Sequence, residues 1–288
     1  MTAYRFCRTD DMGRLVEAHN HCWLPHHPGE PPLTLPQFKQ LVRERQLWCS
    51  SCLIAYEGEE PVGYLFGCKR AHETLLQSFA VHPAHLRRGH GRHLLTSISS
   101  KLAILGPPRL TVEVPAEAEA ALGLLKACGY EQEQTLTDWV RPPGSAPAPD
   151  ASPGDLLIPV TAADLLANGS LQEGSPGPAW ERATPTLLAL GDRLSGTALV
   201  REERLLGAIL YIWNPDGEAE GRLLLLQGSG PETGPVMDRL LGRLLADHPG
   251  RWLFPRALPD EPEAASLRGL GFEPAGQFLR MTAVARPA

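Results

Sequence analysis

The amino-acid sequence predicts an α/β protein built from two similar domains in tandem. Three observations lead to this prediction: the length of the chain, a linker-like segment near its midpoint, and three short segments that recur at nearly one spacing. The chain has 288 residues, which is long for one hydrophobic core and sufficient for two. Apolar residues make up 43% and charged residues 21%, the balance of a globular protein with ample side chains for a core.

The segment near the midpoint runs from residue 142 to residue 154 and consists almost entirely of Pro, Ala, Ser and Gly. Because it has no apolar periodicity that would anchor it in a core, we predict an interdomain linker at 142–154. The two domains are then residues 1–141 and residues 155–288.

Three segments of the first half recur in the second half in the same order. The matched pairs are residues 60–66 with 204–210, Leu94-Leu95 with Leu240-Leu241, and residues 125–131 with 267–273. The three offsets differ by only a few residues, which is typical of a duplicated domain.

The first domain is predicted to alternate strands with helices. A short strand at 4–8 precedes a helix that Thr9 or Asp10 can cap. Apolar periodicity predicts the other elements. They are a first helix with an apolar face at Met12, Leu15, Val16 and His19; a second helix through Phe38, Leu41 and Val42; strands at 52–56, 62–68 and 75–81; a helix at 91–105; a strand at 110–114; a helix at 117–128; and a hairpin at 130–140. Pro83 stops the third of these strands, and Gly106-Pro107-Pro108 ends the helix that follows it.

The turn between residues 81 and 95 carries most of the predicted chemistry. It runs from a strand through a loop rich in Arg and Gly into an amphipathic helix. Gly89 and Gly91 allow the backbone to approach a ligand closely. The first amides of a helix have no partners within it and bind anions, helped here by Arg87, Arg88 and Arg92. The turn therefore predicts a pyrophosphate site.

The same turn resembles the acetyl-CoA loop of the GNAT superfamily of N-acetyltransferases, V-x-P-x-x-(R/Q)-x-x-G-x-(G/A). Val81, Pro83, Gly89 and Gly91 match this pattern, and Leu86 departs from it. A later helix also resembles the family pattern A-x-x-L-Y-x-x-x-G-(F/Y). Ala121, Leu124, Gly129 and Tyr130 fit that pattern, and Leu125 stands in the Tyr position.

This resemblance implies two GNAT-like domains, each a twisted mixed sheet flanked by helices, and an enzyme that moves an acetyl group from acetyl-CoA to a primary amine. The implied cofactor-binding residues are Phe79, Ala80, Val81, Arg87, Arg88, Gly89, His90, Gly91 and Arg92. Splayed strands ending near Val81 and at 110–114 would hold the pantetheine, and the amides near Phe79 to Val81 would polarise the thioester carbonyl.

Two departures from the family pattern favour an alternative, a non-catalytic acyl-CoA-binding or scaffold protein. Leu125 replaces the tyrosine that often protonates the leaving thiolate, and Gln77 stands where many members carry a glutamate base. Glu113 is the predicted catalytic residue in the enzyme reading. It lies between Val112 and Val114, so it projects to the opposite face of the strand and would accept a proton from the amine. An exposed structural carboxylate is the competing interpretation.

The second copy resembles the family in plan only. Alignment on the two leucine pairs places Pro235 at the position of Gly89 and Met237 at that of Gly91. Proline removes an amide donor and methionine obstructs close approach, so acetyl-CoA is expected only in the first domain. The loop Gly228-Ser229-Gly230 is interpreted as a surface turn, with a small-anion site as the alternative.

No metal site is predicted. The motif Cys49-x-x-Cys52, with histidines and Cys22 upstream, could bind zinc, but no second cysteine pair exists, and buried thiols are the preferred interpretation. The loop 21–32, which contains Trp23, His26 and His27, is either a substrate wall or a plain surface loop.

The net charge of −6 lies entirely in the second half, so neither half is expected to bind nucleic acid. The N-terminus lacks a signal-peptide core and no stretch is apolar enough to span a membrane, which predicts a cytoplasmic protein with reduced cysteines. Aminoglycosides, polyamines, amino acids and protein N-termini all fit as the small-molecule or peptide acceptor. A homodimer is left open.

Overall fold

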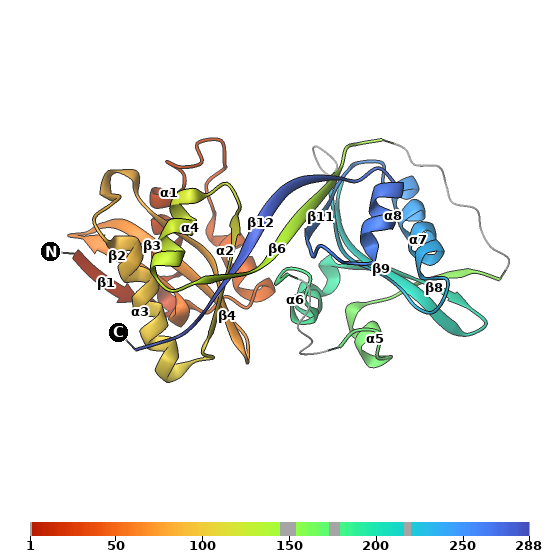
Figure 1. The fold of residues 1–288 in the computed structure, drawn as a ribbon, viewed down its shortest axis with the longest axis horizontal. Coiled ribbons are helices and arrows are strands. Elements are labelled where there is room, and N and C mark those ends of the chain that lie inside the picture. The colour runs from red at the N-terminus through yellow and green to blue at the C-terminus, as the bar shows by residue number, and fades with distance from the viewer. Residues whose placement is uncertain (1, 145–153, 173–178, 216–219, 288) are drawn as a thin grey trace. The chain divides into compact units, whose positions relative to one another are not determined.

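The computed structural model describes residues 2–144, 154–172, 179–215 and 220–287, and the chain forms two compact α/β units (Figure 1). The first unit consists of Met1–Gln134 together with Leu279–Ala288, and the second of Thr135–Phe278. Most of the predicted linker, residues 145–153, lies outside the described residues. In the described part, no helix combines the length and apolar character that crossing a membrane requires.

The first unit has the predicted alternation of strands and helices. Its elements are β1 (Thr2–Phe6), α1 (Met12–Trp23), α2 (Leu35–Glu44), β2 (Leu53–Glu57), β3 (Glu60–Lys69), β4 (Glu73–Val81), α3 (His90–Leu105), β5 (Arg109–Pro115), α4 (Glu119–Ala127) and the start of β6 (Glu131–Arg141). The predicted hairpin at 130–140 is wrong, because β6 is one continuous strand. β1 to β4 pair antiparallel in chain order, and β5 joins β4 in parallel.

The core of the first unit lies between the sheet and α3. The predicted apolar face of α3 is buried at Leu94, Leu95, Ile98 and Leu102. Leu105, at the end of the same helix, is exposed and departs from the prediction. The buried positions of α1 are Leu15, Ala18 and Cys22.

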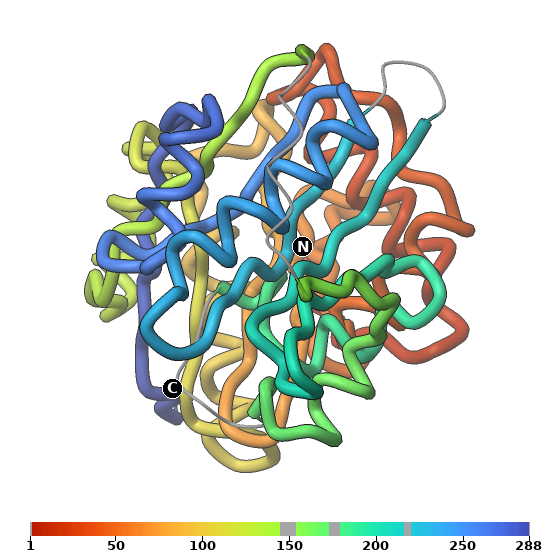
Figure 2. Tube along the Cα trace, turned by 90° about the vertical axis from the view of Figure 1, so that its right-hand side faces the viewer, coloured from red at the N-terminus to blue at the C-terminus, as the bar shows by residue number. Residues whose placement is uncertain are grey.

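The last residues of the chain complete this first core. Met281 is fully buried there, and Leu279, Ala283 and Ala285 pack against the same cluster. β12 (Glu273–Val284) is the neighbour of β5 in the sheet, and the Ala285 amide donates to the Pro108 carbonyl at 2.6 Å. Figures 1 and 2 both show the dark-blue C-terminal segment beside the yellow α3. The boundaries of the compact units therefore differ from a single boundary at residue 141. Residues 279–288 pack with the first unit, and residues 135–141 pack with the second.

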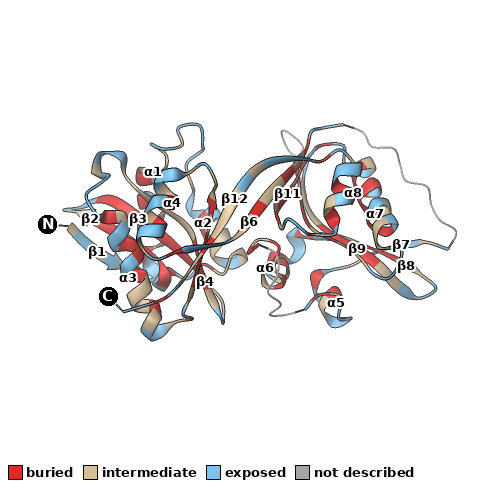
Figure 3. Ribbon diagram, in the orientation of Figure 1, coloured by how far each residue is buried: buried red, intermediate tan, exposed pale blue. Residues whose placement is uncertain are grey.

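The second unit repeats the element order of the first. It contains β7 (Leu156–Pro159), α5 (Ala162–Ala167), α6 (Thr184–Leu190), β8 (Ser195–Arg201), β9 (Arg204–Asn214), β10 (Glu220–Gly228), α7 (Thr233–Asp247), β11 (Arg251–Ala257), α8 (Glu263–Gly269) and the start of β12. The recurring sequence segments fall on matching elements: β3 with β9, α3 with α7, and the end of α4 with that of α8. Figure 3 shows buried residues on the strands of both units and on the helices that cover them. The tandem arrangement is confirmed.

A half-buried histidine in α1, His19, makes the stability of the chain sensitive to pH. His19 packs among aromatic rings, with ring centroids 5.2 Å from Tyr64 and 5.6 Å from Phe66. Burial lowers the pKa of His19; a side-chain hydrogen bond to Asn20 and the charge of Glu30 raise it in part, and His27 lowers it further. The unfolded chain therefore binds a proton at a pH where the folded chain does not, and stability falls as the pH drops below about 6.5.

We expect the free energy of unfolding to decrease between about pH 7.5 and about pH 5, and to decrease less in the variant His19→Gln. Denaturant unfolding at several pH values measures this difference. The exposed His72, substituted by Gln, serves as the matched control and should keep the wild-type slope. Equal slopes in all three proteins would contradict the assignment to His19.

Candidate active site

β4 and β5 pair over a short stretch and then separate. Their parallel ladder begins at Glu73 with Arg109 and ends at Leu75 with Thr111. Both strands continue beyond this point, β4 to Val81 and β5 to Pro115. The sheet therefore opens into a wedge between the carboxyl ends of two parallel strands, which is where the family resemblance would place the pantetheine.

A bulge in β4 adjusts which backbone groups face this wedge. Phe66 of β3 pairs with Ser78 and the next residue, Gly67, pairs with Leu76, so Gln77 is the extra residue in β4. Sequence reasoning had singled out Gln77 only as a replacement for a glutamate. The structure places it where the register of β4 changes.

The amides of Phe79 and Val81 point toward the β5 side of β4. The His82 amide donates to the Val62 carbonyl of β3 at 3.0 Å. Because amides alternate in direction along a strand, those of Phe79 and Val81 face the opposite edge, where β5 has separated. The Ala80 amide faces β3 by the same alternation. Of the three predicted strand residues, Ala80 is therefore the one whose amide does not reach the wedge.

The loop before α3 forms an anion cradle. Gly89 is the N-cap of α3 and has a φ of 89°, a left-handed conformation that favours glycine. Arg87 is also left-handed, with a φ of 63°. Within the described residues, the amides from Arg87 to Arg92 donate to no protein acceptor, and the first paired amide is that of His93. Arg87, Arg88 and Arg92 are exposed beside these amides. Such a run of free amides at a helix N-terminus binds phosphate groups.

Gly91 has a packing role that differs from its predicted one. A Cβ atom at this position would lie 2.7 Å from the Leu124 Cδ2 atom of α4. The missing side chain therefore lets α3 pack closely on α4. The Gly91 amide remains one of the free amides of the cradle.

The loop after α1 reaches the open edge of β4. His26 Nε2 lies 2.9 Å from the Val81 carbonyl oxygen, and the Trp23 indole N–H donates to Glu30 at 2.7 Å. The Trp23 ring stacks on that of His27, with centroids 4.0 Å apart. Of the two interpretations of this loop, the contact between His26 and Val81 favours a wall beside the wedge.

Glu113 lies on the face of β5 opposite the core. Val112 and Val114 are buried in the core cluster, as expected, and Glu113 projects the other way. Its carboxylate lies 3.2 Å from Arg280 Nη2 of β12, and both side chains are largely buried. The sequence could not reveal Arg280, because the two residues are 167 positions apart. A Glu113 carboxylate that accepts a proton would therefore do so while it is paired with Arg280.

Leu125 offers no proton donor, because its side chain is fully buried in the core of the first unit. The nearby Tyr130 is also buried, its hydroxyl has no hydrogen-bond partner among the described residues, and burial raises its pKa far above the usual range.

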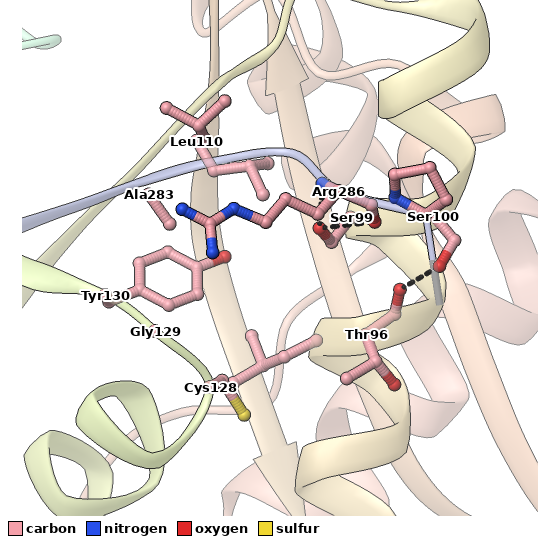
Figure 4. A pocket seen from close by; sticks show the side chains of 12 residues that line it. Thr96, Ser99, Ser100, Leu110, Cys128, Gly129, Tyr130, Ala283 and Arg286 are labelled. Atoms are coloured by element: carbon pink, nitrogen blue, oxygen red, sulfur yellow. Dashed lines mark hydrogen bonds between the residues drawn. The ribbon is translucent and has the colours of Figure 1, made fainter.

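A small cavity of about 150 Å³ lies in the first unit between α3, Tyr130 and the C-terminal segment (Figure 4). Thr96, Ser99 and Arg286 are among its lining residues, and none of the predicted site residues lines it. Ligand sites for drug-sized molecules usually occupy about 300–1,000 Å³. This cavity is too small for acetyl-CoA and is distinct from the wedge.

The second unit has the wedge without the cradle. β10 and β11 pair in parallel from Glu220 with Arg251 to Arg222 with Leu253, and β10 carries a bulge next to Leu223. After β10 ends at Gly228, α7 begins at Thr233, so only residues 229–232 connect them. Between β4 and α3 the connection runs through residues 82–89.

The start of α7 also has features that disfavour an anion. Met237 is buried in the core, and Pro235 lies within the helix. The Glu232 carboxylate precedes the helix and pairs with Arg201 at 3.3 Å. Ser229 donates to the Leu206 carbonyl, which is typical of a surface turn.

The six cysteines are free thiols, as predicted for a chain without disulfides. Cys49 and Cys52 are both buried, and the Cys52 thiol donates to the Trp48 carbonyl at 3.3 Å. Buried thiols are the interpretation preferred from the sequence.

The candidate site thus consists of a parallel strand pair that opens into a wedge, a bulge in its first strand and the amides at the start of the next helix. The sequence model of the acetyltransferase (GNAT) family matches residues 13–130, so this part of the chain, which lies in the first unit, is similar to that family. A curated relative from Yersinia pestis, named "Acetyltransferase", is 24% identical over 132 residues, which cover 46% of this chain and 89% of the relative.

Solved structures share the fold of the whole chain. A tandem GNAT protein from the clavulanic acid biosynthesis pathway superposes with a TM-score of 0.69 at 17% identity, covering 100% of this chain and 99% of that one. A GCN5-related N-acetyltransferase from Sphaerobacter thermophilus gives a TM-score of 0.67 at 14% identity, with 100% and 96% coverage. The tandem two-unit fold therefore has relatives of nearly the same extent.

Proposed function

We propose that the chain is an acetyl-CoA-dependent N-acetyltransferase that acts on a primary amine and binds acetyl-CoA only in its first unit. The observation that carries this proposal is the run of free amides from Arg87 to Arg92 directly after the open wedge. The second unit, with its short connection and Glu232 at the helix start, supports the restriction to one site.

The pyrophosphate would bind at the amides of the cradle, with Arg87, Arg88 and Arg92 adding positive charge. An anion at a helix N-terminus gains only about 0.3–1 kcal/mol from the dipole, so several amides and side chains must act together. The pantetheine would lie along the open edge of β4. The amides of Phe79 and Val81 would then donate to the thioester oxygen as negative charge develops on it.

The reaction would be direct attack of the neutral amine on the thioester carbonyl carbon. The new C–N bond forms as the C–S bond breaks, and the nitrogen loses one proton. We propose Glu113 as the proton acceptor, alone or through a water, with Arg280 positioning the carboxylate. Since Leu125 cannot donate, the sulfur would leave as a thiolate or take a proton from water.

The acceptor class is a primary amine of a small molecule or peptide. The net charge of −6 lies in the second half of the chain and therefore does not select among acceptors at a site in the first unit. The wall formed by the loop after α1, with His26 at the edge of β4, would limit the size of the acceptor.

A release assay for free coenzyme A against a panel of amines tests the proposal. The panel contains a polyamine, an aminoglycoside, amino acids and peptides with free N-termini. Turnover with any of them is expected and would eliminate the alternative, an acyl-CoA-binding scaffold. That alternative is supported by Gln77 at the bulge and by the buried Leu125. Tight acetyl-CoA binding with no turnover on the whole panel would favour it.

A further inference from the structure

Three side chains around the cradle loop converge in a way that acetyl transfer does not require. Glu57 ends β2, His85 lies in the turn after β4, and His90 is the first residue of α3. His85 Nδ1 lies 3.5 Å from Glu57 Oε2, and His90 Nε2 lies 3.6 Å from Glu57 Oε1. One donor atom from each residue lies within 4.8 Å of the other two. The fold thus gathers two imidazoles and a carboxylate at one point.

His90 is the residue that most requires a partner. Its side chain is only 6% exposed, and its buried Nε2 atom has no hydrogen-bond partner in the described part of the chain. The opposite ring atom, Nδ1, lies 2.7 Å from the Tyr4 hydroxyl. An unsatisfied buried polar atom costs about 1–3 kcal/mol. The free Nε2 atom faces Glu57 at a distance beyond hydrogen bonding, so the space between them is suited to a third group.

The donor atoms identify this group as a cation, because the Glu57 oxygen and the unprotonated ring nitrogen of a neutral histidine both offer lone pairs. When Nδ1–H donates to the Tyr4 oxygen, Nε2 directs its lone pair at the carboxylate. Two electron-rich atoms then face each other. Histidines that bind metals commonly have this arrangement: one ring nitrogen binds the metal, and the other ring nitrogen makes a hydrogen bond.

We propose that Glu57, His85 and His90 bind a divalent transition metal ion, for which zinc is the best fit. With bonds of about 2.1 Å in tetrahedral geometry, two ligand atoms lie about 3.4 Å apart. The separations of 3.5 and 3.6 Å, each from one imidazole nitrogen to a different oxygen of the Glu57 carboxylate, are close to this value. Two imidazoles and a carboxylate suit zinc and leave the fourth position for water. The sequence predicted no metal here, because the ligands come from three separate elements.

The buried cysteines are poor competitors for the ion. Burial raises the pKa of Cys7 and of Cys68 to about 12, so both are thiols at neutral pH. A metal ligand must be the thiolate. The expected site therefore contains nitrogen and oxygen donors only, which can be distinguished spectroscopically from a thiolate site.

The guanidinium of Arg88 would compete with the metal ion for His85. Its Nη1 atom lies 3.5 Å from His85 Nδ1, so its positive charge is close to a proposed ligand. The ion would displace this exposed guanidinium from His85. His85 and His90 also flank Arg87, Arg88 and Gly89, so the bound ion would fix both ends of the cradle loop. This last consequence, an effect on acetyl-CoA affinity, rests on the proposed function; the metal site does not.

The test uses the full chain after treatment with a chelator. Calorimetric titration with Zn²⁺ is expected to show one equivalent bound, and Co²⁺ is expected to give the visible absorption of a tetrahedral site without a thiolate charge-transfer band. The variant Glu57→Gln should weaken Zn²⁺ binding at least about tenfold, and Tyr4→Phe by about 10–100-fold through the lost hydrogen bond to His90. Arg88→Gln should tighten binding. The exposed His72, substituted by Gln, is the control and should bind as wild type does.

Circular dichroism of each metal-free variant shows whether it folds, and Glu57→Gln keeps the size of a partly exposed side chain. Three results would overturn the proposal: no stoichiometric binding of Zn²⁺ or Co²⁺, unchanged affinity in Glu57→Gln, or a thiolate band with Co²⁺. Because these titrations contain no acetyl-CoA, their outcome does not depend on whether the proposed function is correct. Acetyl-CoA titrations with and without Zn²⁺ then measure the coupling between the two sites.

Discussion

Deleting residues 279–288 from the full chain is expected to unfold the first unit. Met281 is fully buried in its core, and Leu279, Ala283 and Ala285 pack against the same cluster. Removing one large core side chain costs about 2–5 kcal/mol, and a native domain is stable by only about 5–15 kcal/mol. Loss of a whole strand segment beside β5 should therefore exceed the stability of the unit. Thermal unfolding followed by circular dichroism, with acetyl-CoA titration, measures the loss.

Point variants in the same strand are expected to lower the stability of the first unit by smaller amounts than the deletion does. Met281→Ala should lower the stability of the first unit by about 2–5 kcal/mol. The matched control is Val284→Ala, because Val284 is 63% exposed and should contribute little. The fragment 1–141, which lacks this strand, should not fold on its own. A fragment 1–141 that unfolds cooperatively and binds acetyl-CoA would contradict the assignment of residues 279–288 to the first unit.

Glu113→Gln is expected to lower kcat by about 100-fold while leaving acetyl-CoA binding unchanged, since general-base catalysis commonly contributes about 10²–10⁴-fold. Glu113 is far from the cradle in sequence, and the amide of Gln keeps a polar partner for Arg280. Steady-state kinetics on an amine identified by the release assay, together with acetyl-CoA calorimetry, makes the measurement.

Two further variants separate catalysis from structure. Arg280→Met removes the guanidinium and leaves the Glu113 carboxylate in place, so it should change the pH profile of kcat without abolishing turnover. Glu131→Gln, an exposed carboxylate at the start of β6, is the control and should retain wild-type kcat. An unchanged kcat in Glu113→Gln would remove this residue from the mechanism and leave its ion pair as a structural feature.

The local parts of the fold could be predicted from the sequence because short-range patterns determine them. Apolar periodicity located α3 with its buried Leu94, Leu95 and Ile98. The glycine pattern located the cradle, in which Gly89 adopts the positive φ that glycine tolerates. The repeated segments lie on matching elements of the two units. Each segment is short enough to lie within one strand or helix, so its pattern depends only on that element.

The parts that depend on long-range pairing could not be predicted. A strand pattern at 130–140 predicts extended backbone but not its partner, so the hairpin was assumed where β6 is a single strand. The contribution of Met281 to the first core joins residues from opposite ends of the chain. The ion pair of Glu113 with Arg280 has the same origin. The close packing of Gly91 against Leu124 likewise becomes visible only in three dimensions.

Hydrogen exchange of backbone amides with and without acetyl-CoA measures whether the cofactor binds in the first unit alone. The proposed function predicts that acetyl-CoA slows exchange in peptides covering residues 79–92, because the amides of Phe79, Val81 and the cradle have no acceptor among the described residues. Exchange at residues 229–237 of the second unit should be unchanged. Protection at 229–237, or no protection at 79–92 under saturating acetyl-CoA, would contradict the account.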